Sequence, residues 1–279
     1  MRFAKWQGIG NDFVMLADPN DELELTPEMV RRLSDRRFGI GGDGVIRVAP
    51  SSQGADLFMD YVNADGSVGE MCGNGIRCLA LYAREQGMTD KDVLDVDTRA
   101  GIRRVEVMGE RVRVDMGAPI FEPDRIPVLW DEPNALHAKV ELDQDVVEVA
   151  CLSMGNPHAV IFVDHELEGP LPAGPAIERH EMFPNGTNVE FAKVVTPDRV
   201  WMRVWERGVG ETLACGTGAA AVGVASRLLG GAEPRMNIAL PGGELEVEWA
   251  GSLEEEASVF MTGPAVRSYE GDVDLEELV

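Results

Sequence analysis

The sequence predicts an α+β protein with two similar halves, and three observations support this fold class. Runs typical of strands dominate the 279 residues, and the few helical runs do not alternate with them as in βαβ units. Several landmarks of the first half return in the same order 143 to 145 residues later. Cys72 and Cys215 are the clearest pair, because each heads a Cys-Gly-x-Gly sequence before a stretch of helical composition. We therefore expect a pseudo-twofold arrangement, with a candidate site in a cleft where one cysteine from each half faces the other.

The other landmarks are a Gly-Asn pair before a strand, a turn before a strand, and a polar residue that ends a strand. In the first half these are Gly10-Asn11, Gly42-Asp43-Gly44 and Asn63. In the second half they are Gly155-Asn156, Gly186-Thr187-Asn188 and Glu206. Their common order and nearly constant spacing indicate that the two halves share one topology.

Two helices are expected in the first half. The first is capped by Thr26, has Pro27 at its first position and ends near Ser34. The second covers residues 76–86 and places Arg77 off its apolar face. That apolar face consists of Ile76, Leu79, Ala80 and Ala83.

The third expected helix, residues 219–229, has small residues on every side, so we expect it to be buried all round by a closely wrapped sheet.

Strand signals cover residues 57–62, 103–108, 111–116, 146–154, 159–163, 189–195, 199–205, 236–240 and 244–249. Residues 117–127, rich in Pro and Glu, separate the halves, and residues 261–264 resemble residues 116–119. We therefore expect the tail to return to the first half. The predicted domains are residues 1–116 plus 263–279, carrying Cys72, and residues 117–262, carrying Cys215.

Composition narrows the class of protein. A net charge of −24, from 25 basic and 49 acidic residues, argues against nucleic acid and anionic membranes as partners. The N-terminus leads into no apolar signal segment, and no run is long enough to cross a membrane, so we expect a cytoplasmic protein. Four cysteines are too few for a disulfide scaffold, and a reducing compartment fits them better.

The two repeated cysteines are the candidates for catalysis. A thiol at a helix N-terminus meets the positive end of the helix dipole, which favours thiolate, and the glycines let backbone N–H groups approach an anion. Two such motifs suggest a pair of thiol acid/bases that act on one carboxylate-bearing substrate. Cys78 and Cys151 lie in apolar surroundings and are expected to be packing residues.

The sequence supports neither a metal nor a cofactor. It contains no CxxC or HxxxH motif, its four histidines are scattered, and no nucleotide fingerprint or lysine motif for pyridoxal phosphate appears. Polar residues do gather at strand ends beside the cysteine motifs, where amides can hold carboxylate and ammonium groups without adding charge. They are Asn11, Asn63, Asn74, Asn156, His158, Asn188, Glu206, Arg207 and Thr217.

These motifs, from about Phe3 to Tyr269, closely resemble those of the diaminopimelate epimerases. The resemblance rests on Asn11-Asp12-Phe13, Asn63-Ala64-Asp65-Gly66-Ser67, the run from Met71 to Cys78, Met154-Gly155-Asn156-Pro157-His158 and the run from Glu206 to Gly218. It implies two barrel-like halves, each a sheet wrapped around a central helix, usually in a homodimer. It also implies interconversion of LL- and meso-diaminopimelate, without pyridoxal phosphate or metal, in the synthesis of lysine and peptidoglycan precursors.

The resemblance also assigns roles to single residues. Cys72 and Cys215 become the acid/bases, and His158 and Glu206 tune the thiols. The cradle of the reacting α-carboxylate is made by Gly73, Asn74, Gly216 and Thr217. The remaining substrate contacts are Asn11, Asn63, Asn156, Asn188, Glu206 and Arg207. One departure is Gly44, where many members carry Gln, so a side-chain contact is missing there.

Three other readings stay open. A proline or hydroxyproline racemase-like enzyme would use the same two thiols, but Asn74 stands where that group tends to carry His, and Arg207 suits a second carboxylate. A phenazine-biosynthesis-type isomerase would share the architecture without keeping both thiols. A catalytically silent amino-acid-binding protein would need no pair of cysteines.

Overall fold

The structure of the protein is a computed structural model that describes residues 1–142, 145–171 and 173–274. The chain divides into two compact units. Unit 1 consists of Met1–Asp115 and Thr262–Val279, and unit 2 consists of Met116–Met261. Residues 275–279, the end of the predicted N-terminal domain, lie outside the described residues. No helix within the described ranges is long and apolar enough to cross a membrane.

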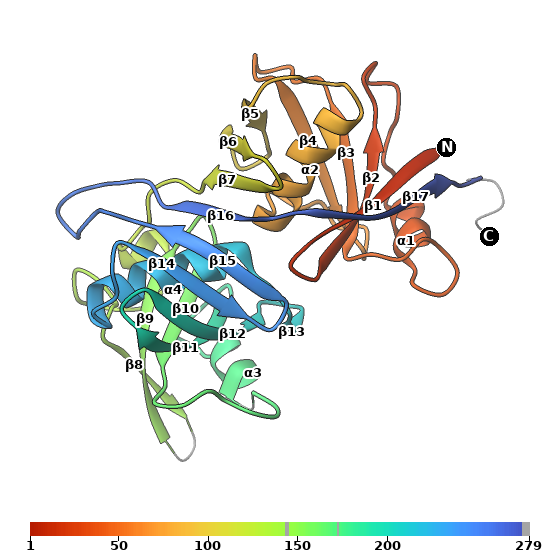
Figure 1. Ribbon diagram of the computed structural model, residues 1–279. Coiled ribbons are helices and arrows are strands. Elements are labelled where there is room, and N and C mark those ends of the chain that lie inside the picture. Colours follow the sequence, from red (N-terminus) through yellow and green to blue (C-terminus); the bar gives the residue numbers. More distant parts are fainter. Residues whose placement is uncertain (143–144, 172, 275–279) are drawn as a thin grey trace. The chain divides into compact units, whose positions relative to one another are not determined.

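Unit 1 is a mixed sheet with two helices (Figure 1). Its strands, in spatial order, are β17 (Val266–Asp272), β1 (Arg2–Gly8), β2 (Asn11–Ala17), β3 (Gly44–Ala49), β4 (Leu57–Asn63), β5 (Val93–Asp97), β6 (Arg103–Met108) and β7 (Arg111–Asp115). The pairs β2–β3 and β4–β5 are parallel and the others are antiparallel. Because β17 pairs with β1, the tail does return to the first half as expected. The chain reaches it through β16 (Phe260–Pro264).

The two helices of unit 1 are α1 (Pro27–Ser34) and α2 (Gly73–Glu85). The N-cap expected for α1 is confirmed, because the Thr26 hydroxyl accepts a hydrogen bond from the Met29 N–H at 3.2 Å. Helix α2 contacts β1, β2 and β3 as well as β6 and β7. The sheet therefore curves around α2 and buries it, as Figure 1 shows.

Unit 2 repeats this plan. Its sheet order is β8 (Ala138–Leu142), β9 (Asp145–Ser153), β10 (Pro157–Phe162), β11 (Asn188–Thr196), β12 (Arg199–Glu206), β14 (Arg235–Leu240) and β15 (Gly243–Glu248). The short β13 (Gly210–Thr212) pairs with the end of β12. Only β10–β11 and β12–β14 are parallel among these named pairs. The remaining elements are a 3₁₀ turn η1 (Pro123–Arg125), α3 (Ala173–Glu178) and the central α4 (Gly216–Leu229).

The register of the two sheets confirms the internal repeat. Phe13 of β2 pairs with Gly44 of β3, and His158 of β10 pairs with Asn188 of β11. The next antiparallel pairs also correspond, Val45 with Val62 in unit 1 and Val189 with Trp205 in unit 2. The α+β fold of two similar halves, each a sheet around a central helix, is therefore confirmed.

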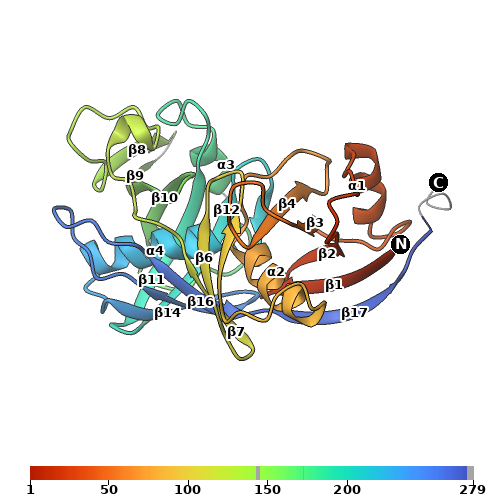
Figure 2. The ribbon, with the colours of Figure 1, turned by 90° about the horizontal axis from the view of Figure 1, so that it is seen from above.

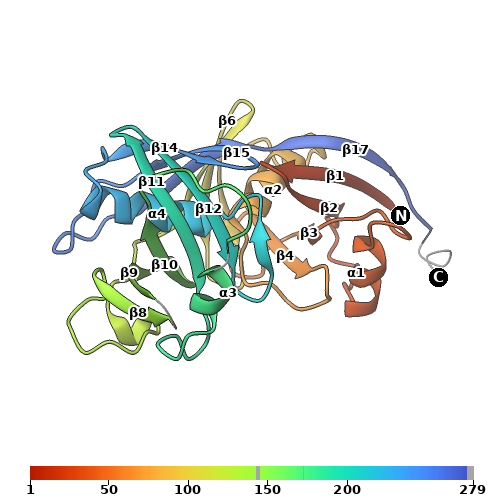
Figure 3. The same cartoon turned by 90° about the horizontal axis from the view of Figure 1, so that it is seen from below.

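The two central helices differ in what surrounds them. Residues Gly218–Ser226 of α4 are all buried, as its small side chains predict, and turned views show the strands of unit 2 around it (Figures 2 and 3). In α2, however, Arg77 is also completely buried, which the expected apolar face did not foresee. Its Nη1 donates to the Gly73 carbonyl at 3.1 Å, and its Nε donates to the Pro264 carbonyl at 3.2 Å. Arg77 therefore ties the first turn of α2 to the returning tail, and burial lowers its pKa to about 10.

Candidate active site

Each of the two repeated cysteines is the N-cap of the central helix of its unit. Cys72 precedes α2 with φ −133° and ψ 117°, and Cys215 precedes α4 with φ −128° and ψ 114°. The Cys72 sulfur accepts a hydrogen bond from the Gly75 N–H, and the Cys215 sulfur accepts one from the Gly218 N–H, both at 3.4 Å. Both helices begin three residues earlier than predicted, because the motif glycines form their first turns. An N–H that points at each sulfur stabilises a thiolate there.

The second glycine of each motif is required by close packing. A Cβ at Gly75 would lie 2.7 Å from Cδ1 of Ile46. A Cβ at Gly218 would lie 2.8 Å from Oε1 of Glu190 and 3.3 Å from the Cys215 sulfur. Glycine at this point lets each helix start lie against a neighbouring strand, and in unit 2 it admits a carboxylate beside the thiol.

In unit 1, an asparagine with a fixed orientation faces the thiol. The Asn11 Nδ2 donates to the Asp43 carboxylate at 2.5 Å, so its Oδ1 is left to accept. That oxygen lies 3.6 Å from the Cys72 sulfur and accepts from Nδ2 of the buried Asn74 at 3.2 Å. Asp43 itself is held by Arg36 at 2.8 Å. The structure therefore brings Asn11, Cys72 and Asn74 together.

Asn63 lies at the end of β4, beside the position where the expected glutamine is missing. A Cβ at Gly44 would lie 2.8 Å from Cε2 of Tyr61 and 2.5 Å from the Val62 carbonyl oxygen. The ring of Tyr61 therefore fills the space that a larger residue at Gly44 would need. Its hydroxyl donates to Oδ1 of Asn63 at 2.6 Å, while Nδ2 of Asn63 donates to Ser67 at 3.0 Å.

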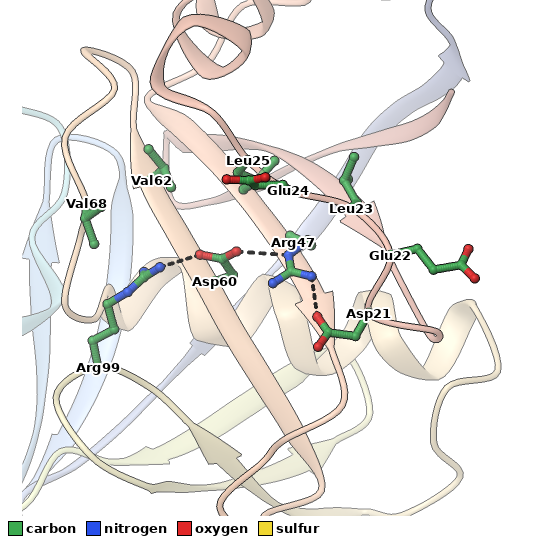
Figure 4. Close-up of a pocket in the computed structure, with 10 residues that line it drawn as sticks. All are labelled: Asp21, Glu22, Leu23, Glu24, Leu25, Arg47, Asp60, Val62, Val68 and Arg99. Atoms are coloured by element: carbon green, nitrogen blue, oxygen red, sulfur yellow. Dashed lines mark hydrogen bonds and ion pairs between the residues drawn. The ribbon is translucent and has the colours of Figure 1, made fainter.

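A chain of charged groups holds the segment that leads to Cys72. Arg99 donates to the carbonyl oxygens of Tyr61 and Gly69, at 3.0 and 3.2 Å, and pairs with Asp60 at 2.5 Å. Asp60 pairs in turn with the buried Arg47 at 2.9 Å (Figure 4). These groups line a cavity of about 290 Å³. Because Arg47 is already paired with Asp18, Asp21 and Asp60, we assign the cluster to support of the loop rather than to substrate.

In unit 2, a run of hydrogen bonds leads from the thiol into the core. The Cys215 sulfur lies 3.5 Å from the Thr217 hydroxyl, which accepts from Nδ2 of Asn156 at 3.2 Å. Oδ1 of Asn156 lies 3.1 Å from Nε2 of His158. Nδ1 of His158 lies 2.7 Å from Oε1 of Glu190, and both of these side chains are completely buried. The expected Asn156, His158 and Thr217 are thus joined to Cys215.

Burial and two neighbouring carboxylates determine the charge state of Cys215. Burial raises its pKa well above the ordinary value, and the carboxylates of Glu206 and Glu190 raise it further. These effects outweigh hydrogen bonds from Thr217 and Gly218, so in this unit Cys215 is a protonated thiol at neutral pH. Burial also raises the pKa of Glu206, against hydrogen bonds with Thr212 and Cys215 that lower it. Glu206 is therefore placed to accept a proton from Cys215.

Arg207 extends from the end of β12 and is exposed. Its backbone N–H donates to Oδ1 of Asn188 at 3.0 Å, and its Nη1 reaches the Asn185 carbonyl at 3.3 Å. Within the described ranges, no ion pair joins its guanidinium to a carboxylate. Asn188 is buried and also donates to the Pro157 carbonyl at 2.8 Å, so it braces the start of the Arg207 segment.

The other two cysteines are packing residues. Cys78 and Cys151 are completely buried, and burial raises the pKa of Cys78 to about 12 and that of Cys151 further. Within the described part of the chain, no three side chains of His, Cys, Asp or Glu gather as they would around a metal ion.

Asp43, Tyr61 and Glu190 contact the candidate residues and were not predicted as part of the site. Asp43 stands in a turn, where Asp is common for local reasons. Glu190 stands between apolar residues of a strand that is buried on both faces, and this was a usable signal, because a buried carboxylate needs a partner.

We expect Glu206→Gln to move the deprotonation of Cys215 to lower pH by about one unit, because an adjacent carboxylate disfavours thiolate. The measurement is the pH dependence of iodoacetamide alkylation of Cys215, followed by peptide mass spectrometry without substrate. Glu211→Gln, on the exposed partner of Arg203, is the control. An unchanged profile for Glu206→Gln would show that Glu206 does not set the thiol's charge.

Comparison with known proteins identifies chains that are similar over nearly their whole length. A family model described as diaminopimelate epimerase matches residues 3–122 and 150–268. The diaminopimelate epimerase of Acetivibrio thermocellus is 46% identical over 284 residues, with all of both chains covered. That of Leptospira biflexa is 43% identical, with 99% of each chain covered.

Solved structures share the fold at low identity. A phenazine biosynthesis protein of the PhzF family from Bacillus anthracis is 18% identical with a TM-score of 0.72, covering 98% of this chain and 99% of that one. A probable proline racemase from Agrobacterium radiobacter is 16% identical with a TM-score of 0.69, covering 98% and 93%. At such identities the likeness shows the fold alone.

Proposed function

The chain belongs to the diaminopimelate epimerase family, and from this premise we propose that it interconverts LL-2,6-diaminopimelate and meso-2,6-diaminopimelate. The observation that carries the proposal is the repeated N-cap cysteine, with nearly the same backbone angles and the same Sγ···H–N contact in both units. An epimerase that inverts an α-carbon needs a base on one face of that carbon and an acid on the other. Cys72 and Cys215 are our candidates for these two groups.

We propose that Cys215 enters the reaction as the thiol and Cys72 as the thiolate when a proton is taken from the face next to Cys72. The raised pKa of Cys215 supports its part. In the reverse direction Cys215 must give its proton to a base first, and the neighbouring Glu206 is the candidate. After one inversion Cys72 carries the proton and Cys215 is the thiolate, so the starting state returns when Cys72 gives a proton to solvent and Cys215 takes one up.

Proton transfer alone is too weak to explain such a reaction, because it typically contributes about 10²–10⁴-fold. Stabilisation of the charge that develops on the α-carboxylate must supply the larger share. The first-turn N–H groups of Gly73, Asn74, Gly216 and Thr217 are the candidates, since helix N-termini favour anions. This chemistry requires neither pyridoxal phosphate nor a metal, and we propose a cofactor-independent enzyme.

For the rest of the substrate we propose Asn11, Asn63, Asn156, Asn188 and Glu206 as contacts of the amino groups and near carboxylate. Arg207 is proposed to bind the distal carboxylate, because its guanidinium is exposed and has no ion-pair partner among the described residues. Tyr61 is proposed to stand in for the glutamine absent at Gly44, since it fills that space and bonds to Asn63. We further propose that the enzyme is a cytoplasmic homodimer in lysine and peptidoglycan precursor biosynthesis.

A proline racemase-like activity is the second candidate, and the shared fold is compatible with it. Arg207 favours diaminopimelate, because proline has no distal carboxylate for it to bind.

The test is to incubate purified protein with LL-diaminopimelate and to separate the diastereomers by chromatography. We expect meso-diaminopimelate after dialysis against a chelator and treatment with a carbonyl reagent that removes pyridoxal phosphate, and no turnover of L-proline. Activity that disappears on this treatment and returns only with a metal or pyridoxal phosphate would reject the proposal. Racemisation of proline at a comparable rate would favour the second candidate.

A further inference from the structure

The run of hydrogen bonds behind Cys215 has a direction. Oδ1 of Asn156 can only accept, so Nε2 of His158, 3.1 Å away, carries a hydrogen. Nδ1 of His158 faces the Glu190 carboxylate at 2.7 Å, and this contact holds a second proton. Whether that proton lies nearer Nδ1 or Oε1, the hydrogen on Nε2 is kept. His158 and Glu190 together therefore hold one proton more than a neutral imidazole beside a carboxylate.

The direction continues to the sulfur. Since Oδ1 of Asn156 is turned to His158, its NH₂ group donates to the Thr217 hydroxyl oxygen at 3.2 Å. The hydroxyl hydrogen of Thr217 is then free to point at the Cys215 sulfur, 3.5 Å away. With the N–H of Gly218, the sulfur thus receives two hydrogen-bond donors. These donors stabilise the thiolate that remains when the proton leaves.

We propose that Glu190 is a positioning residue that acts on Cys215 through His158, Asn156 and Thr217. It keeps the hydrogen on Nε2 of His158, and this hydrogen fixes Asn156 so that Thr217 donates to the sulfur. The role deepens the proposed function, on which its value for catalysis rests, because it assigns Glu190 to the preparation of one of the two acid/base thiols.

Loss of the extra proton would exchange donors and acceptors along these hydrogen bonds. An imidazole with hydrogen only on Nδ1 offers a lone pair at Nε2, which accepts from the NH₂ group of Asn156 after the amide turns over. Oδ1 of Asn156 then faces Thr217 and takes its hydroxyl hydrogen. The Cys215 sulfur loses a donor, and its thiolate becomes less stable.

Packing alone does not explain Glu190. Its Oε2 is buried and has no hydrogen-bond partner among the described residues, so the carboxylate is retained at a cost in stability. The missing Cβ at Gly218 leaves room for Oε1 beside Cys215. The other titratable groups around it are Glu206 on β12 and Cys151 on β9, whose pKa Glu190 helps to raise.

A double-mutant cycle separates the run of hydrogen bonds from the charge of Glu190. The pH dependence of alkylation of Cys215 is measured without substrate in the wild type, Glu190→Gln, Thr217→Val and the double variant. In the Thr217→Val background, Glu190→Gln removes one negative charge together with the extra proton held with His158, so the net charge near Cys215 is unchanged and its pKa should hardly move. With Thr217 present, the same change also costs the sulfur a hydrogen-bond donor, so the pKa of Cys215 should rise, by about one pH unit more than in the Thr217→Val background. Equal shifts in both backgrounds would overturn the proposal.

A second readout follows the histidine directly. In ¹⁵N spectra of the full-length protein labelled at histidine, we expect Nε2 of His158 to carry a hydrogen at neutral pH. It should lose this hydrogen in Glu190→Gln and keep it in Glu190→Asp, which preserves the carboxylate; His158→Gln assigns the signals. An Nε2 without hydrogen in the wild type would also overturn the proposal. Because neither readout uses substrate, inactivity towards diaminopimelate would count against the proposed function and not against this role.

Discussion

Cys72→Ala and Cys215→Ala are each expected to abolish epimerisation, with losses of at least about 10²–10⁴-fold in kcat. Inversion requires proton removal on one face and proton delivery on the other, so neither thiol can replace the other. Each sulfur sits at a helix N-cap with a backbone N–H directed at it, and alanine removes the proton carrier while leaving the glycines of the first turn in place. The measurement is steady-state epimerisation of LL-diaminopimelate by correctly folded variants.

The matched controls are Cys78→Ala and Cys151→Ala. Both thiols are completely buried, and burial disfavours their charged forms, so they should not take part in proton transfer. We expect these variants to lose about 1–2 kcal/mol of unfolding free energy and to keep near-normal kcat. A Cys215→Ala enzyme with wild-type rates, or a Cys151→Ala enzyme that folds normally but is inactive, would contradict the assignment of the two acid/bases.

Arg207→Lys is expected to lower kcat/KM for diaminopimelate by about 10- to 100-fold. A guanidinium binds a carboxylate through two parallel hydrogen bonds, which an ammonium group cannot reproduce. Binding energy from this remote group can be used in the transition state, so kcat and KM should both change. A substrate without the distal carboxylate should be poor for the wild type and no worse for the variant.

Arg199→Lys is the matched control, because Arg199 begins β12, the strand that Arg207 follows, and forms an exposed ion pair with Glu244 at 2.5 Å. Exposed pairs of this kind contribute about 0–1 kcal/mol, so its kinetics should stay unchanged. Kinetic constants for Arg207→Lys equal to those of the wild type, at equal stability, would make Arg207 a surface residue without a role in binding.

The sequence predicted the features that repeat. The offset between Cys72 and Cys215, and the parallel placement of Asn11 and Asn156, follow from one topology used twice, and the registers of β2–β3 and β10–β11 confirm it. Helix caps were also accessible, since Thr26 and the two cysteines act within three residues of their own position.

Other features depend on partners distant in the chain and could not be read locally. The sequence did not predict strand β1, because buried and exposed residues do not alternate regularly along it. Its conformation is determined by pairing with β2 and β17. Arg77 looks like a solvent-facing residue of a helix, yet its partner is the carbonyl of Pro264, 187 residues away. The amide of Asn11 turns its oxygen towards Cys72, whereas the amide of Asn156 turns its NH₂ group towards Thr217. These orientations are set by Asp43 and His158, and the sequence repeat does not predict the difference.

The central claim is that two thiols act on opposite faces of one α-carbon. Its most direct test is the ¹H NMR and mass analysis of LL-diaminopimelate turned over in D₂O and stopped at low conversion. With two bases, the new α-hydrogen of meso-diaminopimelate comes from the thiol that carried solvent deuterium. We therefore predict deuterium in the product while the recovered LL-diaminopimelate remains unlabelled. Equal labelling of substrate and product, or a product that keeps the original hydrogen, would indicate a single base and contradict the account.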